Sequence, residues 1–153
     1  MSERSVTHDT FVIERVYRQS PARVFAAWSS LEAKLRWSSC HEGGRHEMDF
    51  RIGGRETHRA GPAGGPVYFV DARFHDIVPD ERIVFSYDMY ADETHLSVSL
   101  VSVEFRAEGE GTRLVVVEHG AYLDGHDVPA HREQGTGQAL EHLAEELDRQ
   151  TAS

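Results

Sequence analysis

The segment at residues 69–90, FVDARFHDIVPDERIVFSYDMY, constrains the fold of this chain most. It reads as two long apolar strands joined by a tight turn at Pro79-Asp80-Glu81. Two more predicted strands and a closing helix follow it, an order typical of a curved sheet that holds something against a helix. The segment therefore predicts a sheet that encloses a binding cavity, but it does not identify the ligand.

Before this strand pair, the sequence predicts one strand and two short helices. Residues 10–18 carry β-branched and aromatic positions in strand-like alternation. Helices are expected at 21–28 and 31–36, because Ser20 and Ser30 are suitable capping residues. The pair Gly53-Gly54 indicates a two-residue hairpin, since both glycines tolerate the positive φ of primed turns.

An antiparallel meander and one long helix complete the predicted fold. The remaining strands are expected at 67–78, 82–90, 95–107 and 112–119, and the helix at 129–149. An apolar stripe on that helix, formed by Thr136, Leu140, Leu143 and Leu147, has to be buried, and the sheet is the only partner large enough. The prediction is one α+β domain over residues 1–153, with six or seven strands and the last helix across the sheet.

Charge and composition exclude several classes of protein. The formal net charge of -10 opposes binding to nucleic acid or to an anionic membrane surface, both of which rely on Lys and Arg. The only cysteine, Cys40, cannot form an internal disulfide, and the first residues lack the apolar core of a signal peptide. We therefore expect a cytoplasmic protein.

Motifs for metals and cofactors are weak. Neither His41-Glu42 nor His46-Glu47 makes the helical His-Glu-x-x-His arrangement of a metalloprotease, so no metal site is expected. The loop at 61–66 lacks the Lys-Ser/Thr ending of a phosphate-binding loop, and no cofactor is expected. Cys40 precedes His41, but no orienting carboxylate is placed beside them, which favours a bystander thiol over a nucleophile.

The order of these elements resembles the START and birch-pollen-allergen (SRPBCC) superfamily. Within it, the chain is most similar to bacterial homologues of the activator of heat-shock protein 90 ATPase, often labelled polyketide-cyclase-like. The resemblance covers nearly the whole chain and rests on Phe11–Tyr17, Val24–Trp28, Trp37, Asp49-Phe50-Arg51 with Gly53-Gly54, Ile77-Val78-Pro79 through Tyr87, and Gly111-Thr112-Arg113-Leu114. The runs Tyr122–Gly125 and Arg132–Gly137 are similar to one branch of that family.

The resemblance implies a helix-grip fold, in which a bent antiparallel sheet wraps around the long C-terminal helix and leaves a cavity between them. Members of the superfamily include lipid carriers, hormone receptors, cyclases and co-chaperone domains, so the fold alone does not determine the function. On this fold, the expected ligand-binding residues are Trp37, Phe50, Phe74, Phe85, Tyr87, Met89, His95, Ser97, Ser99, Val101, Leu114, Val116, Glu118, Ala139 and Leu143.

One carboxylate on the concave face has two interpretations. The resemblance implies that Glu118 lies on the concave face with Leu114 and Val116, where a carboxyl group is unusual. It could act as a base or anchor a ligand, with His95 and Tyr87 as further acid/base candidates. Alternatively it forms a structural ion pair with Arg15 on the first strand, and this is the interpretation that we favour.

Three hypotheses for function follow. The leading one is a protein that binds a small apolar or aromatic molecule between its sheet and its last helix. The second is a cyclase or dehydratase-type enzyme that uses Glu118, His95 and Tyr87. The third is an interaction module that assists a chaperone. A homodimer is also expected, since Val98, Leu100, Val115 and Val117 make the convex face apolar.

Overall fold

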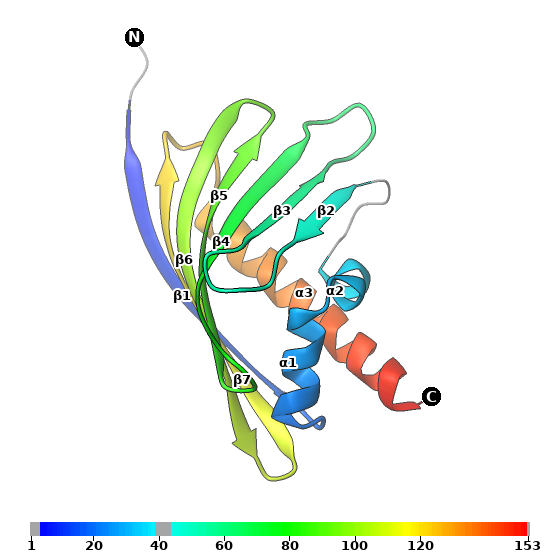
Figure 1. Ribbon diagram of the computed structural model, residues 1–153. Coiled ribbons are helices and arrows are strands. Elements are labelled where there is room, and N and C mark those ends of the chain that lie inside the picture. The colour runs from blue at the N-terminus through cyan, green and yellow to red at the C-terminus, as the bar shows by residue number, and fades with distance from the viewer. Residues whose placement is uncertain (1–3, 39–43, 153) are drawn as a thin grey trace.

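The computed structural model describes residues 4–38 and 44–152, and in this part of the chain one seven-stranded antiparallel sheet is accompanied by three helices (Figure 1). In chain order the elements are β1 (Val6–Tyr17), α1 (Pro21–Ser29), α2 (Leu31–Trp37), β2 (Arg45–Met48), β3 (Arg55–Ala60), β4 (Tyr68–Val78), β5 (Arg82–Ala91), β6 (Thr94–Glu108), β7 (Gly111–Leu123) and α3 (Pro129–Ala152). The strand order is β1-β7-β6-β5-β4-β3-β2. The predicted α+β helix-grip fold is confirmed.

Alternation along the strands gives the sheet two different faces. In β1, Phe11 and Ile13 are buried, whereas Val12 and Val16 between and beyond them are exposed. Figure 1 shows that the sheet is curved and that α3 crosses its concave side, with α1 and α2 on the same side. The buried residues of β1 therefore face the helices.

The two short helices begin where the sequence predicts. The hydroxyl of Ser20 accepts a hydrogen bond from the backbone N–H of Arg23 at 3.3 Å, and that of Ser30 accepts one from Ala33 at 3.2 Å. Each serine satisfies a backbone donor that the first helical turn leaves unpaired. Local signals thus determine where both helices begin.

The long helix α3 is held by its apolar stripe and by a hydrogen bond from β1. Leu140, Leu143 and Leu147 are fully buried, as the spacing predicts. The Tyr17 hydroxyl donates to the carbonyl of Leu140 at 2.9 Å, which ties the end of β1 to the middle of the helix.

No helix of the described residues is long and apolar enough to cross a membrane.

The prediction of a two-residue hairpin at Gly53-Gly54 is wrong. Strand β2 ends at Met48 and β3 begins at Arg55, so residues 49–54 form a longer loop. The glycines are required for a different reason: Gly53 has a φ of +85°, and a Cβ on Gly54 would collide with the carbonyl oxygen of Asp49. The pair marks the end of a loop instead of forming the whole turn.

Candidate functional site

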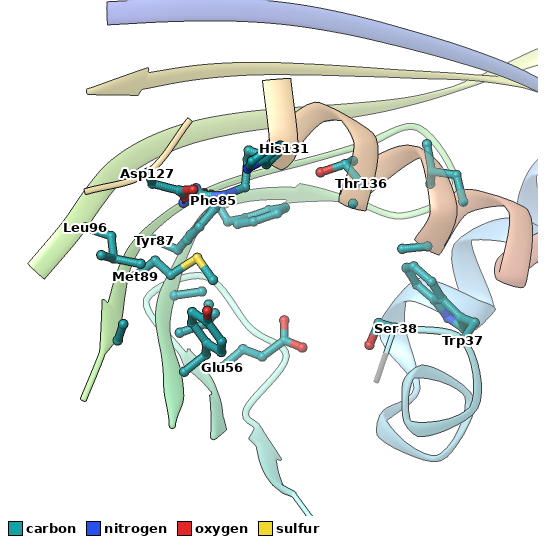
Figure 2. Close-up of a pocket in the computed structure, with 18 of the residues that line it drawn as sticks. Trp37, Ser38, Glu56, Phe85, Tyr87, Met89, Leu96, Asp127, His131 and Thr136 are labelled. Carbon is teal, nitrogen blue, oxygen red and sulfur yellow. Dashed lines mark hydrogen bonds and ion pairs between the residues drawn. The ribbon is translucent and has the colours of Figure 1, made fainter. Parts of the chain in front are cut away.

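A cavity of about 540 Å³ lies between the concave face of the sheet and α3 (Figure 2). Strands β4 and β5 supply one wall through side chains such as Val70, Phe85 and Met89. Trp37 of α2 and Ala139 of α3 supply the opposite side. The lining is mainly apolar, and its few polar groups lie in separate parts of the wall. A space of this size and character is typical of a small-molecule site.

Only part of the predicted ligand-binding set lines this cavity, namely Trp37, Phe85, Tyr87, Met89 and Ala139. Most of the others are buried in the core and lie outside the cavity: Phe74, Val101, Leu114, Val116 and Leu143, with Phe50 packed against them. The reason is that α1 fills this half of the space. The ring of Phe25 lies 5.3 Å from that of Phe105 and 5.8 Å from that of Phe50.

A hydrogen-bonded network closes one end of the cavity. The Tyr87 hydroxyl donates to Oε2 of Glu118 at 2.6 Å and accepts from Nη1 of Arg132 at 2.8 Å. The other terminal nitrogen of Arg132 donates to Oγ of Ser97 at 2.9 Å and to Oδ2 of Asp127 at 2.8 Å. Strands β5, β6 and β7, the segment before α3 and α3 itself thus meet at one guanidinium group.

The network is buried, and burial controls its ionisation. Glu118 is 3 % exposed, with its Oε2 at 3.6 Å from Nη1 of Arg132. Burial and then the negative charge of Glu118 raise the pKa of Tyr87, so its phenol stays protonated. Burial lowers the pKa of Arg132, but its contacts with Tyr87, the charge of Glu118 and the hydrogen bond to Asp127 together raise it by more, so its charge is retained. The cavity wall therefore presents a neutral phenol backed by a buried ion pair.

The predicted ion pair between Arg15 and Glu118 is wrong. In the pairing of β1 with β7, Glu118 lies opposite Phe11, and Arg15 lies opposite Leu114. The two charged residues are therefore four positions apart along the sheet. Glu118 contacts Arg132 instead, and a guanidinium nitrogen of Arg15 donates to the carbonyl of Glu14 at 3.0 Å.

A β-bulge changes the predicted lining on β6. Met89 pairs with Ser97 and Tyr90 pairs with His95, which leaves Leu96 as an extra residue between them. One inserted residue reverses the alternation of side chains beyond it. Leu96 consequently lines the cavity, and His95 is turned to the other face.

His95 makes its contacts on the convex side, where it was not expected. Its Nε2 lies 2.9 Å from Oδ1 of Asp88, and its ring stacks on that of Tyr90 at 4.6 Å. The proposed trio of Glu118, His95 and Tyr87 is therefore not assembled, although Glu118 and Tyr87 contact each other. The remaining predicted residue, Ser99, is buried near them, and its hydroxyl has no hydrogen-bond partner within residues 4–38 and 44–152.

A second charged group lies at the side of the cavity formed by β3 and α2. The Nζ of Lys34, which is 5 % exposed, donates to Oε1 of Glu56 at 2.8 Å, and Nε2 of His46 lies 2.6 Å from Oε2. Burial raises the pKa of Glu56, but the charge of Lys34 and the hydrogen bonds from His46 and Lys34 outweigh it. The pKa of Glu56 falls to about 2, so a carboxylate anion is fixed in the cavity wall.

Sequence reasoning missed Arg132, Asp127, Lys34 and Glu56 as site residues. One signal was available for Lys34: it is the only lysine of the chain, and it shares the buried face of a short helix with Ala33. A lone lysine on such a face needs a buried partner. The other three carry no comparable signal, because each depends on which elements meet in space.

Some residues considered in the sequence cannot be placed. Cys40 and His41-Glu42 lie outside the described residues. In the ranges 4–38 and 44–152, no three His, Cys, Asp or Glu side chains gather as they would around a metal ion. His46 contacts Glu56, and its ring stacks on that of His58 at 4.8 Å.

Comparisons with solved structures agree with this architecture. The Mll3558 protein from Rhizobium loti is 48% identical, with a TM-score of 0.89, over 93% of this chain and 99% of that one. A putative uncharacterized protein from Rhizobium leguminosarum is 41% identical, with a TM-score of 0.92, over 97% and 99% of the two chains. CalU16 from Micromonospora echinospora, at 16% identity and a TM-score of 0.64 over 98% and 88%, shares the fold.

None of the curated proteins compared with the chain matches it. A family model does, and the match extends from the residue after β1 to the last turns of α3. It therefore includes every element that lines the cavity. Because residues 18–148 match the model described as "Activator of Hsp90 ATPase homolog 1-like protein", the chain belongs to this family.

Proposed function

We propose that this protein binds a small apolar or aromatic molecule in the cavity between its sheet and α3. The observation that carries the proposal is the cavity itself, with a volume of about 540 Å³ and a mainly apolar lining. Pockets for small molecules combine such a lining with a few well-placed polar groups. The neutral phenol of Tyr87 and the carboxylate of Glu56 are two polar groups of this kind.

The position of the polar groups supports an amphipathic ligand. Phe85 and Met89 on the sheet and Ala139 on the helix offer an apolar surface to the body of the ligand. Tyr87 and Glu56 offer hydrogen bonds at its edges. Since the polar side chains are already held by buried partners, they lose little conformational freedom when a ligand arrives.

Native mass spectrometry against a library of aromatic metabolites tests this proposal. The blocking variant Ala139→Trp places a large ring in the cavity, and Gln138→Trp adds the same ring at an exposed position of α3 as the control. We expect retained ligands in the wild type and in Gln138→Trp, and their loss in Ala139→Trp. Absence of any bound aromatic compound in the wild type would overturn the proposal.

A second candidate function, a dehydratase or cyclase, has the contact between Tyr87 and Glu118 in its favour. A base that removes a proton next to a carbonyl could act through this pair, because Tyr87 can pass its own proton to Glu118 while it takes one from the substrate. The proton held by Glu118 would return through Tyr87 to the departing hydroxyl group, which leaves as water. Mass spectrometry of hydroxyketone substrates would detect the loss of water. Turnover that survives Tyr87→Phe unchanged would exclude this route. The chaperone hypothesis is supported by the family description alone.

A further inference from the structure

The carboxylate of Glu56 is a hydrogen-bond acceptor built into the wall of the cavity. It projects from β3, its side chain is 14 % exposed, and it lines the cavity together with Trp37 and Ser38 of the facing segment (Figure 2). Lys34 holds one of its oxygens at 2.8 Å and His46 lies 2.6 Å from the other. Each carboxylate oxygen has two lone pairs, so Glu56 can accept a further hydrogen bond without giving up these contacts.

The cations near the cavity are already paired. Lys34 contacts Glu56, and its Nζ also lies 5.5 Å from the ring centroid of Trp28. Arg132 contacts Asp127 and Glu118. Three carboxylates thus surround two fixed cations, and the histidines in the lining, His126 and His131, are exposed at its edge.

This distribution of charge disfavours an anionic ligand. A carboxylate or phosphate that entered would lose its hydration, and among the described residues at the cavity both Lys34 and Arg132 already have carboxylate partners. It would also approach Glu56 and Asp127, which carry the same sign of charge. A hydroxyl group on an uncharged ligand is favoured instead, because a buried anion is a strong hydrogen-bond acceptor.

We propose that Glu56 is a specificity-determining residue that accepts a hydrogen bond from a hydroxyl of an uncharged aromatic ligand. The inference rests on the proposed binding function and adds the class of ligand to it. The aromatic body lies against Phe85 and Met89, and the hydroxyl points towards β3. An acidic ligand of the same size is rejected by the carboxylates.

Isothermal titration with three naphthalene compounds of similar size tests the inference on the wild type. Naphthol donates a hydrogen bond, methoxynaphthalene does not, and naphthoate is an anion. A hydrogen bond to a charged group contributes about 1.5–3 kcal/mol, so we expect naphthol to bind at least about tenfold more tightly than either of the others. Equal affinities, or an advantage for naphthoate, would overturn the inference.

The variant Glu56→Gln tests whether Glu56 causes this selectivity. We expect naphthol to lose most of its advantage, and naphthoate to bind more tightly because Lys34 no longer faces an anion. Glu47→Gln, on the neighbouring strand and 64 % exposed, is the matched control and should leave the order unchanged. Unaltered selectivity in Glu56→Gln would refute the role of Glu56. Equal binding of the three compounds would refute the inference and leave the proposed function standing, whereas no binding of any compound to the wild type would count against both.

Discussion

The buried pair of Lys34 and Glu56 gives the sharpest prediction about stability. Its two side chains are 6% and 14% exposed, and the pKa of Glu56 falls to about 2. An unfolded glutamate titrates near pH 4.3, so the depressed pKa contributes about 3 kcal/mol to folding at neutral pH. Because the folded pKa is the lower one, this stability is present above about pH 5 and is lost as the pH falls towards 2.

The variant Lys34→Met removes the charge and keeps most of the side-chain volume. Breaking a buried pair leaves an uncompensated ion, and we expect the free energy of unfolding at pH 7 to fall by about 3 kcal/mol. The difference from the wild type should then shrink as the pH is lowered from 5 to 3. In this range Glu56 takes up a proton in the unfolded chain but keeps its charge in the folded wild type, so the wild type loses the stability that the pair contributes. Urea denaturation at a series of pH values measures both quantities.

A matched control uses an exposed ion pair on the neighbouring strand. Arg45 contacts Glu47 at 3.2 Å, but the two side chains are 78% and 64% exposed, so Arg45→Met should cost less than about 1 kcal/mol at any pH. The reasoning is refuted if Lys34→Met destabilises the protein by the same amount at pH 7 and pH 3. That result would mean that Lys34 acts through packing alone.

Three further predictions concern other parts of the molecule. Tyr87→Phe removes the donor to a buried carboxylate and should lower the free energy of unfolding by about 2 kcal/mol in urea denaturation. Leu100→Glu places a charge on the exposed apolar patch that Leu100 shares with Val98, and it should convert the expected homodimer to a monomer in analytical ultracentrifugation. Gly54→Ala forces a Cβ against the carbonyl of Asp49 and should lower the melting temperature by several degrees in differential scanning calorimetry.

Each of these has a clear contrary outcome. Wild-type stability in Tyr87→Phe would mean that water replaces the hydroxyl without cost. A wild-type protein that sediments as a monomer would remove the convex face as a subunit contact. An unchanged melting temperature in Gly54→Ala would show that the loop before β3 can shift without cost.

The fold could be predicted from the sequence because its signals are local. Capping serines precede both short helices, and the leucines at 140, 143 and 147 mark the buried face of α3 wherever that helix packs. Strand alternation likewise identifies a buried face without reference to any partner. The order of the elements then leaves few ways of covering the sheet.

The site was harder to predict from the sequence, because it depends on strand register and on contacts between distant elements. The bulge at Leu96 carries no Gly or Pro signal, yet it turns His95 away from the cavity. The partner of Glu118 depends on where α3 begins above the sheet, which brings Arg132 within 3.6 Å and leaves Arg15 opposite Leu114. Alternation along one strand contains no information of this kind.

The central claim is that an aromatic molecule binds between the sheet and α3. A titration of the ¹⁵N-labelled protein with naphthol, followed by two-dimensional NMR, tests it most directly. The account predicts saturable shifts at the amides of Phe85, Tyr87 and Ala139, which line the cavity, and none at Val98 and Leu100 on the convex face. Shifts confined to the convex face, or no shifts at all, would contradict it.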